Sequence, residues 1–330
     1  MRVNVIVWDN GFGLTRHLRL LGGALTAAGH QVHVSALRRG KLRKILRPWK
    51  LRARIAWQRL RGDDSRRRYD LNIMIEHVRP EYAPIARRNV LLPHPEWFLD
   101  SDRIALPIID HVFAQTRHAL TLFGQLGCRV TYTGFTSEDR LDRAVPRERA
   151  FFHLAGRSQN KGTERLLALW RRHPEWPRLT VVQNPRTALP GAAAANIDHR
   201  VDYLDDAELQ RLQNAHVFHL CPSETEGFGH YIVEAMGLGA LVITLDAPPM
   251  HELVTPERGL LVAADRTGTQ NLATTYFFDE SSMEAAVAHA LALDAAAIAR
   301  LGAAARAWFE GNDAAFRTRL DAAVRAVATE

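Results

Sequence analysis

The chain has 330 residues, of which 47% are hydrophobic and 24% are charged, and these proportions exclude an intrinsically disordered protein. Its 43 Lys and Arg residues outnumber 36 Asp and Glu residues, and the net charge of +7 favours an anionic partner. The excess lies in residues 38–68, which hold fourteen basic and two acidic residues, a local charge of +12, so the rest of the chain sums to −5.

The two cysteines, Cys128 and Cys221, lie in apolar sequence at the expected ends of strands. This placement argues against a disulfide framework and a thiolate metal site, and it favours a reducing compartment. The first ten residues lead directly into strand-like sequence without a signal-peptide pattern, and no apolar stretch reaches the roughly 18–20 residues of a membrane span. We expect a cytoplasmic protein that can contact the inner face of the membrane.

The first half alternates β-branched runs with helical periodicity, which predicts a doubly wound parallel sheet. The expected helices are Leu14–Ala28, which ends at Gly29 as a left-handed cap, and Ala119–Leu126. The expected strands are Val3–Trp8, Gln31–Leu37, Leu71–Ile75, Val90–Leu92, Val112–Ala114 and Val130–Tyr132.

A polar, charged stretch, residues 134–149, separates this half from a second series of strands and helices. We therefore predict two domains, 1–145 and 146–330, with a ligand-binding cleft between them. The strands expected in the second are Phe151–Ala155, Leu179–Val182, Val217–Leu220, Leu241–Leu245 and Leu260–Val262. The helices expected there are Thr163–Arg172, Asp206–Gln213, Tyr231–Leu238 and two or three in the Ala-rich tail from Ser282 onward.

The most informative stretch is residues 221–234, CPSETEGFGHYIVE, which follows an apolar strand and opens a helix. Gly227 and Gly229 permit a tight turn, and the amides at the start of the helix favour an anion such as phosphate. Glu226 and Glu234 would repel phosphate, so hydroxyl groups are their sensible partners, because a carboxylate accepts two hydrogen bonds from a vicinal diol. Together these features describe a nucleotide-sugar site.

The turn of residues 156–162, GRSQNKG, lies in the same position after an earlier strand. Cations at the start of a helix oppose the helix dipole, so Arg157 and Lys161 favour an anionic ligand there. Two positive charges are about what a diphosphate leaving group needs without a metal, so the predicted chemistry is glycosyl transfer with no metal or other cofactor.

These motifs resemble the GT-B glycosyltransferases, and specifically the large retaining family with the E-x7-E motif, glycosyltransferase family 4. The residues that carry the resemblance are Gly156, Arg157, Lys161, Gly162, Pro222, Ser223, Glu226, Gly227, Phe228, Gly229, Glu234 and Pro249–Leu253. The resemblance implies two Rossmann-like doubly wound domains that face a central cleft. It also implies that Arg157 and Lys161, four residues apart where five is common, hold the diphosphate, that Glu234 holds the ribose hydroxyls, and that Glu226 with the Gly227–Gly229 amides holds the transferred sugar. Phe228 inherits an indirect role in this site.

In the first half, the resemblance places the glycine loop at residues 10–13, so that Gly13 faces the diphosphate and the acceptor. It also places His94 against the sugar, although Glu96 or His77 could face the site instead. Asp100 and Asp102 match the Asp-x-Asp metal signature of another glycosyltransferase fold, but no strand precedes them and we interpret this match as chance.

The basic segment also carries an apolar stripe at helical spacing, interrupted by Pro48. It could be a solvated helical pair packed on the sheet, a cationic surface that lies on anionic lipid, or a surface for a polyanionic acceptor. The residues predicted for an acceptor or membrane surface are Arg43, Lys44, Arg47, Trp49, Lys50 and Trp57.

The sequence therefore predicts a retaining, metal-independent glycosyltransferase that moves a sugar from a UDP- or GDP-linked donor to a glycan or lipid-linked glycan. Two alternatives are a DNA-base glycosyltransferase of the phage type and a non-catalytic nucleotide-sugar-binding module. Binding of duplex DNA that weakens steeply with salt would favour the first alternative. Intact Arg157, Lys161, Glu226 and Glu234 argue against the second.

Overall fold

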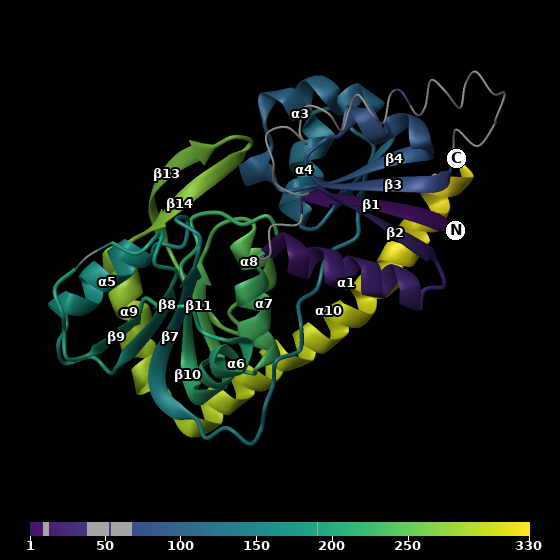
Figure 1. Cartoon of the computed structure of the whole chain (residues 1–330). Coiled ribbons are helices and arrows are strands. Elements are labelled where there is room, and N and C mark those ends of the chain that lie inside the picture. Colours follow the sequence, from purple (N-terminus) through teal and green to yellow (C-terminus); the bar gives the residue numbers. More distant parts are fainter. Residues whose placement is uncertain (9–12, 38–52, 54–67, 190) are drawn as a thin grey trace. The chain divides into compact units, whose positions relative to one another are not determined.

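The computed structural model describes residues 1–8, 13–37, 53, 68–189 and 191–330 (Figure 1). They form two compact units: unit 1 is Met1–Phe135 with Asp313–Glu330, and unit 2 is Thr136–Asn312. The predicted glycine loop before Gly13 and the six residues predicted for the acceptor or membrane surface lie outside the described residues.

Unit 1 is built on a six-stranded parallel sheet in the order β2-β1-β3-β4-β5-β6 (Figure 1). Its strands are β1 (Arg2–Trp8), β2 (Gln31–Leu37), β3 (Tyr69–Glu76), β4 (Ala86–Pro93), β5 (His111–Ala114) and β6 (Val130–Tyr132). The helices between them are α1 (Gly13–Ala27), η1 (Pro80–Ile85), η2 (Pro95–Trp97), α3 (Asp100–Ala105), η3 (Leu106–Ile108) and α4 (Arg117–Gln125). Every strand predicted in this half is confirmed.

Buried polar side chains help to set the register of this sheet. Asn4 on β1 donates to the side-chain oxygen of Asn72 on β3 over 2.9 Å, and Asn72 donates to that of Asn89 on β4 over 2.8 Å. The alternation of strand side chains between the two faces would break this ladder if a strand slipped by one residue. Gly29 caps α1 with φ +82°, as predicted.

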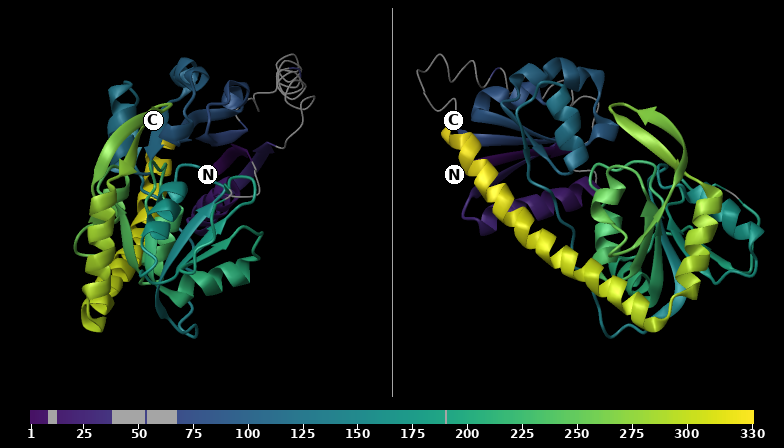
Figure 2. Two further views of the ribbon diagram at one scale, coloured as in Figure 1. Left: turned by 90° about the vertical axis from the view of Figure 1, so that its left-hand side faces the viewer. Right: turned by 180° about the vertical axis from the view of Figure 1, so that it is seen from behind.

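Unit 2 is built on a second six-stranded parallel sheet in the order β12-β11-β10-β7-β8-β9. Its strands are β7 (Glu148–Gly156), β8 (Leu179–Gln183), β9 (Ile197–Arg200), β10 (His216–Cys221), β11 (Leu241–Leu245) and β12 (Leu260–Val262). Helices α5 (Thr163–Arg172) and α9 (Glu280–Ala292) cover one face, and α6 (Asp206–Ala215) and α7 (His230–Gly237) cover the other (Figure 2). The short helix α8 (Met250–Leu253) follows β11. This arrangement confirms the second doubly wound sheet.

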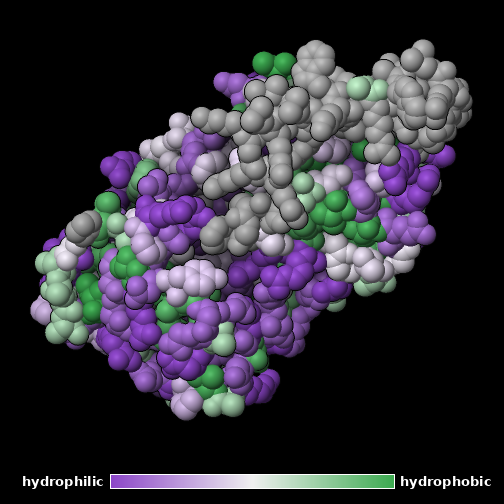
Figure 3. All heavy atoms as spheres, in the orientation of Figure 1, coloured by the Kyte–Doolittle hydropathy of each residue, from purple (hydrophilic) through white to green (hydrophobic). Residues whose placement is uncertain are grey.

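An antiparallel hairpin that the sequence analysis did not predict follows β12, formed by β13 (Ala264–Gln270) and β14 (Ala273–Phe278). After α9 the chain ends in α10 (Ala295–Thr329), so the Ala-rich tail forms two helices. Among the described residues, none of the helices has by itself the length and hydropathy of a membrane span. Only α9 and α10 taken together reach that length and hydropathy, and the chain bends by 113° between them. The surface over unit 2 seen in Figure 3 is mainly hydrophilic, with apolar residues in small groups.

The division between the units falls ten residues before the predicted boundary at 145/146. Residues of the predicted linker bond to unit 2: Arg140 donates to Gln213 over 2.7 Å, and the amide of Asp142 donates to Asn214 over 2.8 Å. The last turns of α10 return to unit 1, where Asp321 lies 2.9 Å from His30 and Phe316 packs against Phe135. The periodicity of the Ala-rich tail predicts a helix, but it does not indicate that the last turns of this helix pack in unit 1.

Candidate functional site

The two motif-bearing loops of unit 2 lie at the carboxyl ends of neighbouring strands, because β7 pairs with β10 in parallel. The amide of Glu224 in the second loop donates to the carbonyl of Asn160 in the first over 2.9 Å. Gly162 has φ +61°, and a Cβ on it would lie 2.8 Å from the carbonyl oxygen of Pro222. Only glycine permits this approach without displacement of one loop.

Four side chains from these loops and α7 form a compact polar cluster. Lys161 Nζ lies 3.7 Å from Glu226 Oε1 and 3.0 Å from the centroid of the Tyr231 ring. Ser223 Oγ donates to Glu226 Oε1 over 2.5 Å and lies 2.6 Å from the Tyr231 hydroxyl. The structure thus brings together the cation predicted for the diphosphate and the carboxylate predicted for the sugar.

The environment of this cluster is largely screened from solvent. Burial lowers the pKa of Lys161, and the Glu226 carboxylate beside it opposes that shift. Burial also raises the pKa of Tyr231 well above its usual range, so this phenol stays neutral and hydrogen-bonds to Ser223. A cation and a carboxylate held in a poorly solvated site interact strongly with the phosphate and hydroxyl groups of a ligand.

A buried histidine joins the two strands, β7 and β10, that lead into the loops. His153 on β7 donates from Nδ1 to the carbonyl of Leu220 over 2.8 Å, and its Nε2 lies 2.9 Å from Thr163 Oγ1 on α5. Burial lowers the pKa of His153 to about 4, so it is neutral at physiological pH.

Cys221 and Cys128 are free thiols whose pKa values are raised by burial, so neither is poised as a thiolate.

Gly229 is the N-cap of α7 with φ +98°, and a Cβ there would lie 3.0 Å from the Leu253 side chain. Gly227 is buried beside it, and Phe228 is buried with its ring edge-to-face on His230 at 5.4 Å. Phe228 therefore packs within the loop. Glu234 lies one turn further along α7, is 1% exposed, and accepts a hydrogen bond from Gln213 over 3.1 Å.

Arg157 lies in the same loop as Lys161 and is partly exposed. The unpredicted hairpin supports both loops: Asn160 donates to the side chain of Gln270 over 2.6 Å, and the amide of Tyr276 donates to the carbonyl of Glu224 over 2.7 Å. The sequence of the hairpin is rich in threonine, and this β-branched content was the signal from which its strands could have been predicted.

In unit 1, His94 directly follows β4 and is 7% exposed. Its Nδ1 lies 3.8 Å from Glu76 Oε1, and its ring packs edge-on against His17 at 5.0 Å between centroids. Glu76 ends β3 with φ 72°, a conformation uncommon for a residue other than glycine. Burial acts to raise the pKa of Glu76, but His94, together with the charges of His77 and Arg79, outweighs it, and the net pKa is lowered. No motif in the sequence indicates this carboxylate.

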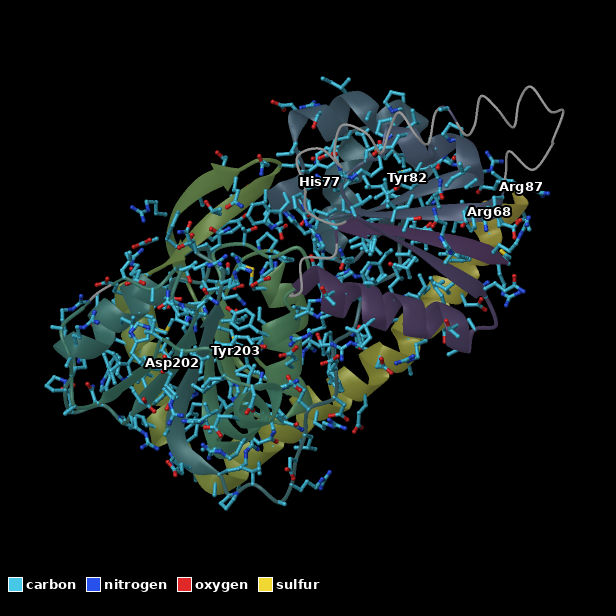
Figure 4. The ribbon with its side chains drawn as sticks, in the orientation of Figure 1. Arg68, His77, Tyr82, Arg87, Asp202 and Tyr203 are labelled. Carbon is cyan, nitrogen blue, oxygen red and sulfur yellow. The ribbon has the colours of Figure 1, made fainter. Side chains whose placement is uncertain are left out.

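Asp102 has a structural role in unit 1. It accepts hydrogen bonds from the amides of Val78 and Leu99 over 2.9 and 3.0 Å, and it lies 2.8 Å from His77 Nδ1. His77, labelled in Figure 4, is thereby tied to α3, and Glu96 is buried in η2. Among the described residues, no group of three or more His, Cys, Asp or Glu side chains is arranged to hold a metal ion.

Comparison with known proteins gives both a family match and structural neighbours. Residues 148–275, which contain both loops and most of the hairpin, match the family described as Glycosyl transferases group 1. A search of curated proteins found no significant match.

Solved structures of similar fold cover the whole chain. Sucrose-phosphate synthase from Thermosynechococcus elongatus is 17% identical with a TM-score of 0.66, covering 100% of this chain and 96% of its own. Anabaena Alr3699/HepE, in complex with UDP and glucose, is 16% identical with a TM-score of 0.70, covering 99% and 100%. A glycosyltransferase from Rickettsia africae is 12% identical with a TM-score of 0.71, covering 99% and 98%.

These neighbours and the two parallel sheets show that the chain has the GT-B fold. The family match adds that the region with Lys161, Glu226 and Glu234 is similar to group 1 glycosyltransferases. Fold and match together support a glycosyltransferase.

Proposed function

We propose that this protein is a retaining, metal-independent glycosyltransferase of the E-x7-E type that uses a UDP- or GDP-linked sugar. The observation that carries the proposal is the pairing of Lys161 with Glu226 across two joined loops. A nucleotide sugar has an anionic diphosphate next to a ring of hydroxyls, so it requires a cation and a hydrogen-bond acceptor side by side.

In this proposal the donor lies along the carboxyl ends of β7 and β10. Lys161 and Arg157 neutralise the diphosphate, and the amides at the start of α7 add positive partial charge. Glu226 accepts hydrogen bonds from the transferred sugar, and Glu234 accepts them from the ribose. Tyr231 acts indirectly, since its ring lies against Lys161 and its hydroxyl bonds to Ser223.

The reaction needs few further groups. The bond between the anomeric carbon and the diphosphate oxygen breaks, and the acceptor oxygen bonds to the same face of the sugar. The acceptor hydroxyl gives its proton to the departing diphosphate, so a separate general base is not required. Lys161 and Arg157 stabilise the negative charge that develops on the leaving group, and this differential stabilisation lowers the barrier.

In unit 1, the sequence resemblance supports His94 as a residue that contacts a sugar. Glu76 can orient the His94 ring, since Glu76 Oε1 lies 3.8 Å from His94 Nδ1. The sequence resemblance also supports Gly13, the first residue of α1, as a donor-binding residue.

The acceptor that we propose is a glycan or lipid-linked glycan, handled by a cytoplasmic enzyme bound peripherally to the inner face of the membrane. The charge of +12 in residues 38–68 supports an anionic surface as the partner, because each basic residue near such a membrane contributes about 1 kcal/mol. Flotation with anionic liposomes tests this part, and a variant depleted of these arginines is expected to stay unbound. A depleted variant that still floats would refute the membrane role of the segment.

The catalytic proposal is tested with a panel of UDP- and GDP-sugars and the release of nucleoside diphosphate as the readout. We expect turnover with at least one donor, a Glu226→Gln variant that is at least 100-fold slower, and a product whose anomeric configuration by NMR matches the donor. Inversion of configuration would refute the retaining assignment. Absence of both binding and turnover across the panel would refute the proposal as a whole.

A further inference from the structure

A buried chain of hydrogen bonds leads from the segment at the start of unit 2 to Glu234. Arg140 Nε donates to Gln213 Oε1 over 2.7 Å, and Gln213 Nε2 donates to Glu234 Oε2 over 3.1 Å. The three residues are 4%, 2% and 1% exposed. Arg140 is held in turn by Asp206, whose side chain and carbonyl accept hydrogen bonds over 2.9 and 3.1 Å.

The chemistry of these groups fixes the direction of the Gln213 amide. A guanidinium can only donate hydrogen bonds, so the amide oxygen must face Arg140. The amide nitrogen then faces Glu234, and a carboxylate can accept its hydrogen bond. A flipped amide would set two donors against each other at one end and two acceptors at the other. Because all three groups are buried, either mismatch would leave desolvated polar atoms unsatisfied.

Anchoring one oxygen of Glu234 also fixes the rotation of its carboxylate about the last side-chain bond. That rotation decides the direction in which the carboxylate accepts further hydrogen bonds. Glu234 lies on α7, whose residues are almost all buried, so the helix holds the Cα of Glu234 in place and Gln213 on α6 orients the charged end.

We propose that Gln213, oriented by Arg140, is a positioning residue that aligns Glu234 with the ribose hydroxyls of the donor. This inference rests on the proposed function, which assigns Glu234 to the ribose. It adds a residue that does not touch the donor and a connection between the donor site and the segment by which the chain enters unit 2.

The test is calorimetric binding of a nucleoside diphosphate, UDP or GDP according to the donor panel, and of its 2′,3′-dideoxy counterpart. The parent is expected to lose about 10- to 100-fold in affinity for the dideoxy compound, since hydrogen bonds to a charged group are lost. Gln213→Leu is expected to bind the natural nucleotide about tenfold more weakly and the dideoxy compound as the parent does. Arg140→Leu, which removes the donor that holds the Gln213 amide oxygen, should reduce the same discrimination.

Gln210→Leu is the matched control. Gln210 lies on α6 and donates to the carbonyl of Arg140 over 3.1 Å. Its loss therefore removes a bond to the same segment without removing the bond to Glu234, and this variant should discriminate as the parent does. The thermal midpoint of each variant shows that it is folded.

Two results would overturn the inference, and they differ in what else they overturn. If the parent discriminates but Gln213→Leu and Arg140→Leu keep the parent ratio, Glu234 binds the ribose without their help and the proposed function stands. If the parent binds both nucleotides equally, the assignment of Glu234 to the ribose fails and the inference fails with it.

Discussion

Replacement of Lys161 by methionine tests the electrostatics of the donor site most sharply. Methionine keeps much of the length of the lysine side chain, so Lys161→Met removes the charge with little loss of packing. The substitution leaves Glu226, whose side chain is 17% exposed, without the cation that lies 3.7 Å away. It also removes the cation from the face of the Tyr231 ring.

The size of the effect follows from these distances. Unit charges 3.7 Å apart attract by about 4 kcal/mol at an effective dielectric constant of about 20. Part of this attraction is offset by desolvation of Lys161, so we expect unfolding to be easier by about 2–3 kcal/mol. For a domain of this size that corresponds to a thermal midpoint lower by roughly 4–12 °C. Binding of a diphosphate at a similar distance from Lys161 should weaken by a comparable free energy, which corresponds to about 30- to 150-fold in affinity.

The assay compares binding of the nucleoside diphosphate with binding of the nucleoside alone. Lys161→Met should weaken only the diphosphate, and addition of Glu226→Gln should restore most of the thermal midpoint without restoring diphosphate affinity. Equal loss for nucleoside and diphosphate would mean that the site has collapsed. Unchanged diphosphate affinity would refute the assignment of Lys161 to the phosphates.

Three further predictions concern the loop glycine, the buried histidines and unit 1. Gly162→Ala places a Cβ 2.8 Å from a carbonyl oxygen, so it should lower the thermal midpoint. Gly127→Ala is the control, since Gly127 also has a positive φ of +78° but open space around it, and its thermal midpoint should fall less. Equal losses in the two variants would contradict the close approach. Burial lowers the pKa of His153 to about 4 and that of His219 to about 3, so the unfolded state takes up protons first as the pH falls below about 6.5. As the pH falls further, the free energy of unfolding should decrease by up to about 1.4 kcal/mol per pH unit for each histidine. A thermal midpoint that stays constant from pH 7.5 to 5 would contradict this. Glu76→Gln should lower kcat at least tenfold with the donor Kd unchanged, because it loosens the histidine proposed to contact the sugar; parental kcat would argue against that role.

The parallel sheets were predictable because buried strands in such folds are nearly continuous apolar runs. Strands such as β11 and β12 were predicted to the residue, as was α5. The strand β9 was missed because its sequence, IDHR, is polar and partly exposed throughout. The hairpin of β13 and β14 was missed for a related reason, since it lies outside the main sheet and its polar residues alternate only weakly.

The candidate site was predictable where a short motif contains both the turn and the reactive group, as for Glu226 and Lys161. Contacts between distant segments were not. Glu76 and His94 come from different strands, and Gln213 reaches Glu234 from another helix. Asp102 shows why a two-residue motif is weak evidence of a metal site, since the second carboxylate of this Asp-x-Asp pattern caps a helix and holds His77.

The central claim is that Glu234 and its neighbouring loops bind a nucleotide sugar. Its most direct test is calorimetric binding of the UDP- and GDP-sugar panel to the parent and to Glu234→Gln, a variant of nearly equal shape. We expect that the parent binds at least one donor and that the variant, with an unchanged thermal midpoint, binds it at least tenfold more weakly. A parent that binds none of the donors, or a variant that binds as the parent does, would contradict it.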